Sequence, residues 1–271
     1  MFRKLRPVCL MQTVTISAYR QEVFIMAIVI IPAWQPDEKL ISLVDAFTER
    51  GLQSIVVDDG SGEQYQHFFR RIKETSLVFT HVKNRGKGAA IKTALAFVKK
   101  ELWDCQTVGI MDADGQHLPE DMIRLLEVAK KNKNTLVLGV RDVGKNMPLK
   151  SRVGNQITRI VFRLASGVTL TDTQTGLRAF GWELVDAMLK VEGERYEYET
   201  NVLLEMARKK VPIKEVEICT IYHDNNSGSH FRPLKDSLRI YRDILRFTFS
   251  SFSSFMLDYL LFFSVCWYRN L

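Results

Sequence analysis

The sequence predicts an α/β domain with a mainly parallel central sheet and further helices at its C-terminal end. Two observations predict this class. Short β-branched runs alternate with segments of helical periodicity, and polar residues follow directly where several of these runs end. Strands that alternate with helices of this length form a parallel sheet. A chain of 271 residues, 46% of them hydrophobic, is long enough for one full-size domain with a small appendage.

The alternation is clearest in the first half of the chain. Asp37 is placed to cap the first helix and Gly51 to end it. Residues 84–88 form a basic, glycine-containing loop that opens an alanine-rich helix running to about residue 102. We expect strands at 27–32, 54–61, 77–82, 108–116 and 136–141. The ranges 54–61 and 108–116 include the polar turns in which these strands end. Further helices are expected at 37–51, 63–73 and 118–131.

After residue 141 the alternation breaks. Residues 151–165 and 196–210 have helical patterns, and residues 213–219 predict a strand. Between the helices, residues 171–180 read as a polar loop that enters a short strand, and residues 225–229 as a flexible loop.

The two ends of the chain differ from the domain between them, which we expect at residues 26–232. Residues 1–25 read as a non-native or disordered extension, because Met26 directly precedes the first strand. Residues 233–271 combine an amphipathic helix that has a basic flank with a hydrophobic tail, 247–268, interrupted by Asp258. We expect them to attach the protein to a membrane surface; helices packed on the domain or on another subunit are the alternative.

Composition narrows the classes of partner. The net charge of +7 comes without a long Lys/Arg run, which argues against nucleic acid and favours an anionic substrate or a membrane surface. The four cysteines are scattered, as expected for reduced thiols in the cytosol, and the five histidines lack metal-ligand spacing.

One stretch carries the strongest chemical signal. An apolar run leads into Asp112, Asp114 and Gln116, and alternation along a strand would point the two carboxylates the same way. Paired carboxylates at the carboxyl end of a strand suit a hard divalent cation that also binds a diphosphate. An ordinary acidic turn is the alternative interpretation.

Other polar residues are expected at the same edge of the sheet. Asp58 and Asp59 would be spare hydrogen-bond acceptors for a base or a ribose, or else an acidic capping turn; Arg85 and Lys87 would meet a phosphate or base. The chain has no P-loop GxxxxGK[ST], no GxGxxG and no GxSxG motif, which argues against an NTPase, a dehydrogenase and a serine hydrolase.

Together these motifs resemble the family 2 glycosyltransferases of the GT-A fold, in particular the polyprenyl-phosphate glycosyltransferases that include dolichol-phosphate mannose synthase. The resemblance covers about residues 26–250, and the tail resembles the start of a C-terminal membrane domain that is truncated here. The motifs that carry it are Ile30-Ile-Pro-Ala33, Val56-Val-Asp-Asp-Gly-Ser61, Asn84-x-Gly-Lys-Gly88, Asp112-Ala-Asp-Gly-Gln116, Asp172-Thr-Gln-Thr-Gly176 and Tyr198-Glu-Thr-Asn-Val202.

The resemblance implies a nucleotide-sugar donor, a Mg²⁺ or Mn²⁺ ion and a polyprenyl-phosphate acceptor. It implies that Asp114 and Arg141 are catalytic, that Asp112, Asp114 and Gln116 hold the metal, and that Thr173, Gln174 and Arg178 face the acceptor. The donor would be bound by Pro32, Ala33, Asp58, Asp59, Arg85, Lys87 and Asp112. The chain departs from the family at Trp34-Gln35-Pro36, where Tyr-Asn-Glu is common, so the contact to the base is not assigned.

The expected reaction is the inverting transfer of a hexose to an undecaprenyl-type phosphate at the cytoplasmic membrane face. A homo-oligomer is compatible with the sequence. A phosphate acceptor is already largely dianionic at neutral pH and needs orientation, from Arg141 and Arg178, more than a general base. Two alternatives stay open. One is a hydroxyl acceptor, with Asp172 or Glu197 as the base, and the other is a non-catalytic nucleotide-sugar binding protein.

Overall fold

The computed structural model describes residues 27–102, 104–141, 149–219 and 259, the side chains of 149–155 and 157 excepted. The expected extension at 1–25, the amphipathic helix and the hydrophobic tail therefore lie outside the described residues, except for Tyr259. Among the helices that are described, none combines the length and the apolar character that a membrane span requires.

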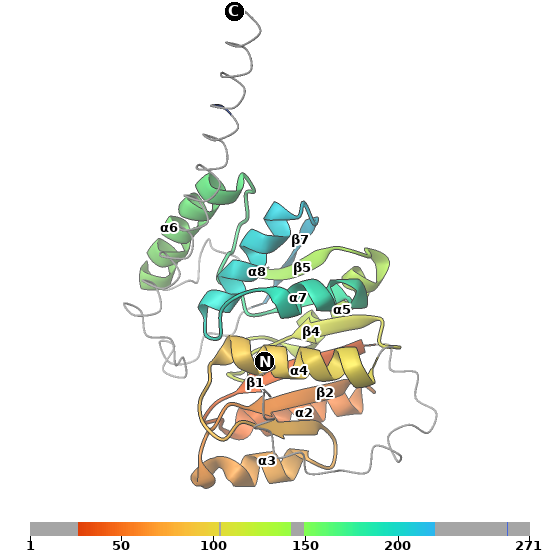
Figure 1. The fold of residues 1–271 in the computed structure, drawn as a ribbon. Coiled ribbons are helices and arrows are strands. Elements are labelled where there is room, and N and C mark those ends of the chain that lie inside the picture. The colour runs from red at the N-terminus through yellow and green to blue at the C-terminus, as the bar shows by residue number, and fades with distance from the viewer. Residues whose placement is uncertain (1–26, 103, 142–148, 220–258, 260–271) are drawn as a thin grey trace, which may run out of the picture.

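One sheet organises the chain (Figure 1). It has seven strands in the order β3-β2-β1-β4-β6-β5-β7. All neighbouring strands are parallel except for β6, which is antiparallel to both β4 and β5. The mainly parallel sheet predicted from the sequence is confirmed. The strands are β1 (Ala27–Ala33), β2 (Gln53–Asp58), β3 (Leu77–Thr80), β4 (Thr107–Ile110), β5 (Leu136–Arg141), β6 (Arg178–Gly181) and β7 (Ile213–Ile218).

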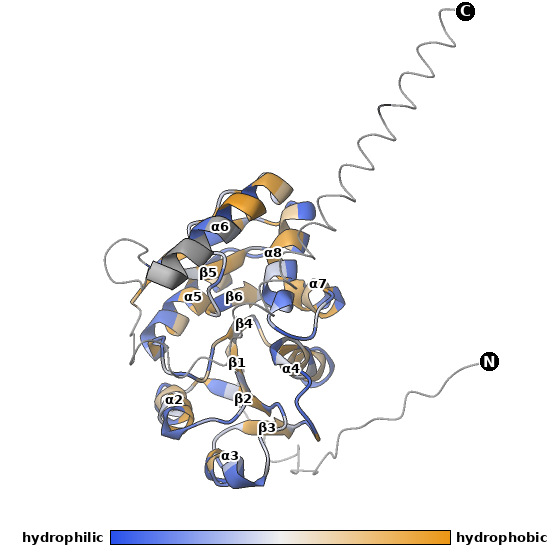
Figure 2. Ribbon diagram, turned by 90° about the vertical axis from the view of Figure 1, so that its left-hand side faces the viewer, coloured by the Kyte–Doolittle hydropathy of each residue, from blue (hydrophilic) through white to orange (hydrophobic). Residues whose placement is uncertain are grey.

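Helices cover both faces of the sheet (Figure 2). One face carries α2 (Glu38–Glu49), α3 (Gln66–Ile72) and α5 (Pro119–Lys131), and the other carries α4 (Lys87–Glu101), α7 (Val185–Lys190) and α8 (Glu197–Arg208), with α6 (Leu149–Ser166) against α8. Two short 3₁₀ segments, η1 (Glu63–Tyr65) and η2 (Trp182–Leu184), precede α3 and α7.

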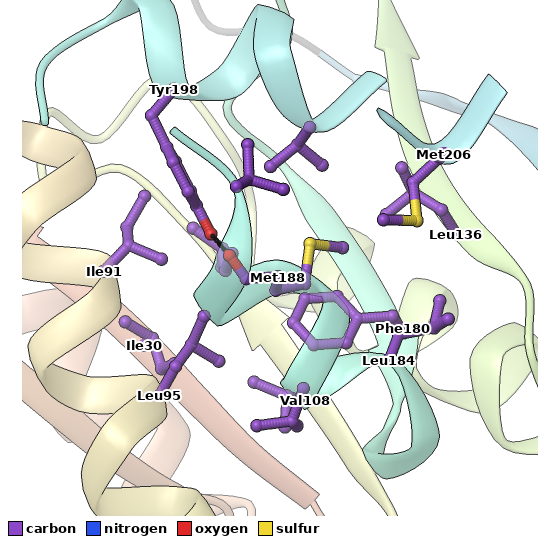
Figure 3. Packing of buried hydrophobic residues seen from close by; sticks show 14 of the residues in the cluster. Ile30, Ile91, Leu95, Val108, Leu136, Phe180, Leu184, Met188, Tyr198 and Met206 are labelled. Carbon is purple, nitrogen blue, oxygen red and sulfur yellow. Dashed lines mark hydrogen bonds between the residues drawn. The ribbon is translucent and has the colours of Figure 1, made fainter. Parts of the chain in front are cut away.

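This layering explains the apolar strands. Because each central strand is covered on both faces, nearly every position of β1, β4 and β6 is buried, and β1 is a continuous β-branched run without an alternating pattern. On the α4 face, Ile30 and Phe180 of the sheet pack with Ile91 and Leu95, and the Tyr198 hydroxyl donates to the carbonyl of Met188 at 2.9 Å (Figure 3).

The helix boundaries follow the capping signals. The Asp37 carboxylate accepts a hydrogen bond from Lys39 N at 2.9 Å and caps α2, as predicted. Pro119 begins α5, where a missing N–H costs nothing. Two expectations were wrong in detail: the third strand ends at Thr80 and not at 82, and residues 63–73 open with a 3₁₀ turn because Gly62 leaves the first turn without a side-chain cap.

The antiparallel β6 positions the site. In its register Arg178 lies opposite Ile110 of β4, so the amino end of β6 meets the carboxyl end of β4. The polar loop that enters β6, residues 172–177, is therefore delivered to the edge at which Asp112 leaves β4. Residues 60 positions apart in the chain become neighbours by this one reversal of direction.

Candidate active site

Asp112 and Asp114 lie in a turn directly beyond β4. The strand ends at Ile110, so the alternation expected of a strand does not bring the carboxylates together; the turn does. Gly115 has φ 73°, a left-handed conformation that glycine adopts readily, and Gln116 N donates to Asp114 Oδ1 at 3.0 Å. The predicted proximity of the two aspartates is thus obtained for a different reason.

The two carboxylates differ in their electrostatics. Burial, and then the negative charge of Asp112, raises the pKa of Asp114 to about 6. Burial also opposes ionisation of Asp112, but the nearby Lys87 ammonium outweighs it and lowers the pKa of Asp112 below its ordinary value. The site therefore concentrates negative charge, and the protein cation that acts most strongly on Asp112 balances this charge only in part.

That cation is Lys87, the first residue of α4. Its Nζ lies 2.6 Å from Asp112 Oδ1 and 2.8 Å from Glu199 Oε1. Burial disfavours the charged lysine, yet the two carboxylates raise its pKa above the ordinary value. Glu199 stands in the first turn of α8 and was not singled out from the sequence, because its only signal there was membership of the motif at 198–202.

The donor set fits a divalent cation bound partly by its substrate. Among the described residues, no group of three or more His, Cys, Asp or Glu side chains could hold a metal by itself. Two neighbouring carboxylates and an amide oxygen are nonetheless the ligands that Mg²⁺ uses when a diphosphate and water complete its coordination. The raised pKa of Asp114 supports this fit, since a cation would relieve the repulsion that causes part of it.

Arg141 and Asp172 form a buried pair beside the aspartates. Arg141 Nε donates to Asp172 Oδ2 at 2.6 Å and Nη2 donates to Oδ1 at 3.1 Å, a two-pronged arrangement. Asp172 is 0% exposed and also accepts from Gln174 N at 2.9 Å. Asp172 thereby fixes both the Arg141 guanidinium and the loop that begins β6. Thr173 is buried in that loop.

Arg178 lies deeper than an acceptor-facing residue would. Its guanidinium is buried, and it donates from Nη1 to the Glu199 carbonyl at 2.7 Å and from Nε to the Thr175 carbonyl at 3.2 Å. Nη2 has no hydrogen-bond partner among the described residues. Its observed contacts join the start of β6 to α8, and its expected role toward the acceptor stays a prediction.

The two aspartates at the end of β2 already have protein partners, which corrects their interpretation as spare acceptors; their contact with the donor stays a prediction. Asp58 is buried and accepts from Ser61 N at 2.8 Å and Gln66 Nε2 at 2.9 Å. Asp59, also buried, accepts from the His81 ring and from two backbone amides, those of Arg85 and Gly86. In the structure both carboxylates hold loops in place, because buried carboxylates must be satisfied by the protein.

The remaining expected donor residues lie around these loops. Pro32 and Ala33 end β1 in register with Val57 and Asp58 of β2. Arg85 is half exposed, with its guanidinium 3.9 Å from the Glu194 carboxylate. Residue 35 of the departing Trp34-Gln35-Pro36 segment has φ 51°, and its N–H donates to Ser61 Oγ at 2.8 Å, which ties the end of β1 to the turn after β2.

A second residue that sequence reasoning missed is His117. The ring is buried, Nδ1 has no hydrogen-bond partner among the described residues, and burial lowers the pKa of the imidazole. The charges of Asp112 and Lys87 and those of Arg141 and Asp172 act on it, so it lies near both ion pairs. Its position directly after Gln116 was the available signal.

The tight packing at Gly176 gives a test of the arrangement. A Cβ at this position would lie 2.2 Å from Asp112 Oδ2. We therefore expect Gly176→Ala to displace the Asp112 carboxylate and to lower the rate of the expected reaction by about a hundredfold, on the scale of losing one well-placed electrostatic group. Steady-state kinetics measure the loss, and unchanged turnover would contradict the placement of Asp112.

Comparison with known proteins assigns the class. Residues 28–185 match the family model described as glycosyl transferase family 2, which is more than half of the chain. The chain belongs to this family and is a glycosyltransferase. The resemblance predicted from the motifs is confirmed.

Two curated relatives and one solved structure illustrate the similarity. An uncharacterised protein of Methanocaldococcus jannaschii is 30% identical over 200 residues, 72% of this chain and 81% of the relative. A UDP-N-acetylglucosamine–dolichyl-phosphate N-acetylglucosaminyltransferase of Methanococcus voltae is 29% identical over 214 residues, 71% of this chain and 84% of that protein. A crystal structure of glucosyl-3-phosphoglycerate synthase from Mycobacterium tuberculosis, with Mn²⁺, UDP-glucose and phosphoglyceric acid, has a TM-score of 0.58 at 16% identity and covers 83% of this chain and 79% of that chain. At this identity the last likeness concerns the fold, and the expected GT-A fold is confirmed.

Proposed function

We propose that this glycosyltransferase moves a hexose from a nucleotide diphosphate sugar to a polyprenyl phosphate, with inversion at the transferred carbon. The observation that carries the proposal is the state of Asp172. This carboxylate is fully buried, and its two oxygens are occupied by Arg141 and Gln174 N. A hydroxyl acceptor needs a general base within reach, whereas a phosphate acceptor, with a second pKa of about 6, does not.

Glu197, the other candidate base, also has hydrogen-bond partners within the protein. Glu197 Oε1 accepts from the backbone N–H groups of Glu194 and Arg195, at 3.3 and 3.2 Å, at the start of α8. These contacts hold the turn that leads into α8, whose N-cap residue is Tyr196. The dolichyl-phosphate acceptor in the name of the Methanococcus relative supports the same class of acceptor.

On the donor side, Asp112, Asp114 and Gln116 would hold Mg²⁺ or Mn²⁺. The ion would stabilise charge that develops on the departing diphosphate. Lys87 already pairs with Asp112, so its ammonium stands next to the place where that charge appears. Arg141, fixed by Asp172, is the cation we assign to the phosphate groups on the other side.

Attachment to the cytoplasmic face of a membrane completes the proposal. Its support is the sequence of residues 233–271, with a basic amphipathic segment followed by an apolar one, and the net charge of +7. A lipid acceptor is presented at a membrane surface, so an enzyme held there meets it at a high local concentration.

The test is a transfer assay with matched acceptors. Undecaprenyl phosphate and undecaprenol are offered with a panel of nucleotide sugars, with Mg²⁺, with Mn²⁺ and with EDTA. We expect transfer only to the phosphate and only with a divalent ion, at a rate that rises with pH through about 6 and then levels off. Equal use of the alcohol would favour the base-dependent alternative, and donor binding without any release of nucleotide would favour the binding protein.

A further inference from the structure

A hydrogen-bonded triad lies beneath the loop that begins α4. The His81 ring, just after β3, places Nδ1 2.7 Å from Asp59 Oδ1 and Nε2 2.9 Å from Thr93 Oγ1, in the second turn of α4. Because a carboxylate only accepts, Nδ1 donates to it. The side chains of Asp59 and His81 are each 4% exposed. No motif or comparison assigns this histidine a role.

The carboxylate of the triad also holds the loop itself. Asp59 Oδ1 accepts from Arg85 N at 2.9 Å, and Oδ2 accepts from Gly86 N at 2.7 Å. Gly86 has φ 109°, a conformation that the chain must be held in, and Lys87 follows it directly. One buried carboxylate therefore sets the backbone from which the Lys87 side chain departs.

His81 decides how that carboxylate is oriented. Its own N–H donates to the Asp58 carbonyl at 2.8 Å, so the end of β2 fixes its backbone. The ring then bridges β2 to α4, and without its Nδ1–H one oxygen of Asp59 would keep only a single backbone partner. Charge-assisted hydrogen bonds that are shielded from water are about twice as strong as neutral ones, so the loss is large.

We propose that His81 is a positioning residue of the donor site, which acts through Asp59 on the Arg85–Gly86 backbone and thereby places the Lys87 ammonium beside Asp112. The inference rests on the proposed function, in which Lys87 faces the diphosphate. The inference adds to that function the group that keeps Lys87 beside Asp112. An ordinary core histidine is the competing explanation, and it predicts lower stability with an unchanged site.

Two substitutions at His81 separate these explanations. In His81→Asn the amide nitrogen takes the place of Nδ1 and keeps the bond to Asp59, whereas in His81→Gln it takes the place of Nε2 and keeps only the bond to Thr93. Both variants lose the ring and create similar cavities, so their loss of packing is matched. Ser54→Ala is a control for stability alone. Its hydroxyl pairs with Ser76 Oγ at 2.6 Å, also between β2 and β3 but at the opposite edge of the sheet.

Two readouts are measured on the full-length protein. The first is hydrogen exchange of the Arg85 and Gly86 amides, which needs no enzyme activity. The second is calorimetric binding of UDP and of GDP in the presence of Mn²⁺. For His81→Gln we expect amide exchange at least about tenfold faster and nucleotide binding about tenfold weaker, as for one lost charge-assisted hydrogen bond. For His81→Asn and Ser54→Ala we expect both to stay within about threefold of the unmodified protein.

Two other results would overturn the inference. Equal exchange in the two His81 variants would mean that the ring does not hold the loop. Faster exchange in His81→Gln with unchanged nucleotide binding would make the triad purely structural. If the unmodified protein bound neither nucleotide, the proposed donor class would fail instead, and the exchange result would show by itself whether His81 orders the loop.

Discussion

Asp114→Asn should lower the rate of sugar transfer by at least about a hundredfold, which is the scale of removing one group that stabilises charge in a transition state. Asparagine keeps an oxygen in the same position but loses the negative charge that a divalent ion requires. The fold should be retained, because Asp114 lies in the turn beyond β4 and its charge is disfavoured by burial and by Asp112. Transfer kinetics in Mg²⁺ and thermal unfolding of the same sample measure the two effects.

Asp186→Asn is the matched control. Asp186 is exposed on α7, where it pairs with Lys99, and it lies outside the site. It should leave the rate unchanged. Near-normal turnover of Asp114→Asn in Mg²⁺ would refute the assignment of the metal ligands.

Lys87→Met should destabilise the metal-free protein by about 3–5 kcal/mol, the range measured when one partner of a buried ion pair is removed. The side chain of Lys87 is 12% exposed and lies against both Asp112 and Glu199, so its loss leaves two shielded carboxylates without their cation. Urea unfolding without divalent ions measures the change. Part of the loss should be recovered with Mn²⁺, because the ion would neutralise Asp112.

The control is a single lysine–carboxylate pair of similar distance at the surface. Lys99 Nζ is 2.7 Å from Asp186, but both side chains are about half exposed, so Lys99→Met should change stability little. If the two lysine substitutions lowered the free energy of unfolding equally, the contacts of Lys87 with Asp112 and Glu199 would stabilise the protein no more than an exposed pair does.

The order of elements was predictable because its signals are local. β1 and β5 are short apolar runs that are almost wholly buried, and Asp37 and Pro119 mark helix starts by their own chemistry. The place of β6 was not predictable in this way. A strand of four residues carries no pattern that says which neighbours it joins, and insertion between β4 and β5 depends on contacts distant in sequence.

The site residues likewise divide into those with a local signal in the sequence and those without one. Asp112, Asp114 and Lys87 were predicted as site residues from motifs after strands and loops, and the structure brings them together. Glu199 and His81 were missed because a glutamate on a helix and a histidine after a strand become informative only when the fold supplies their partners. Asp58 and Asp59 were recognised, yet whether a carboxylate is spare depends on amides from other loops.

The antiparallel β6 also sets the order in which the sheet can assemble. β4 and β5 are not neighbours; β6 lies between them and supplies the connection from the β1–β4 half to the β5–β7 half. On a ribosome that makes the chain from its N-terminus, β5 emerges before β6. The edge of β5 that pairs with β6 therefore stays unpaired until β6 has been made. Pairings so distant in sequence form slowly, because the entropy cost of closing a long loop comes before the favourable contacts between the strands. The second half of the sheet, with Arg141 at the end of β5, is therefore completed late, after residues 178–181 have entered between β4 and β5 and residues 213–218 have paired with β5.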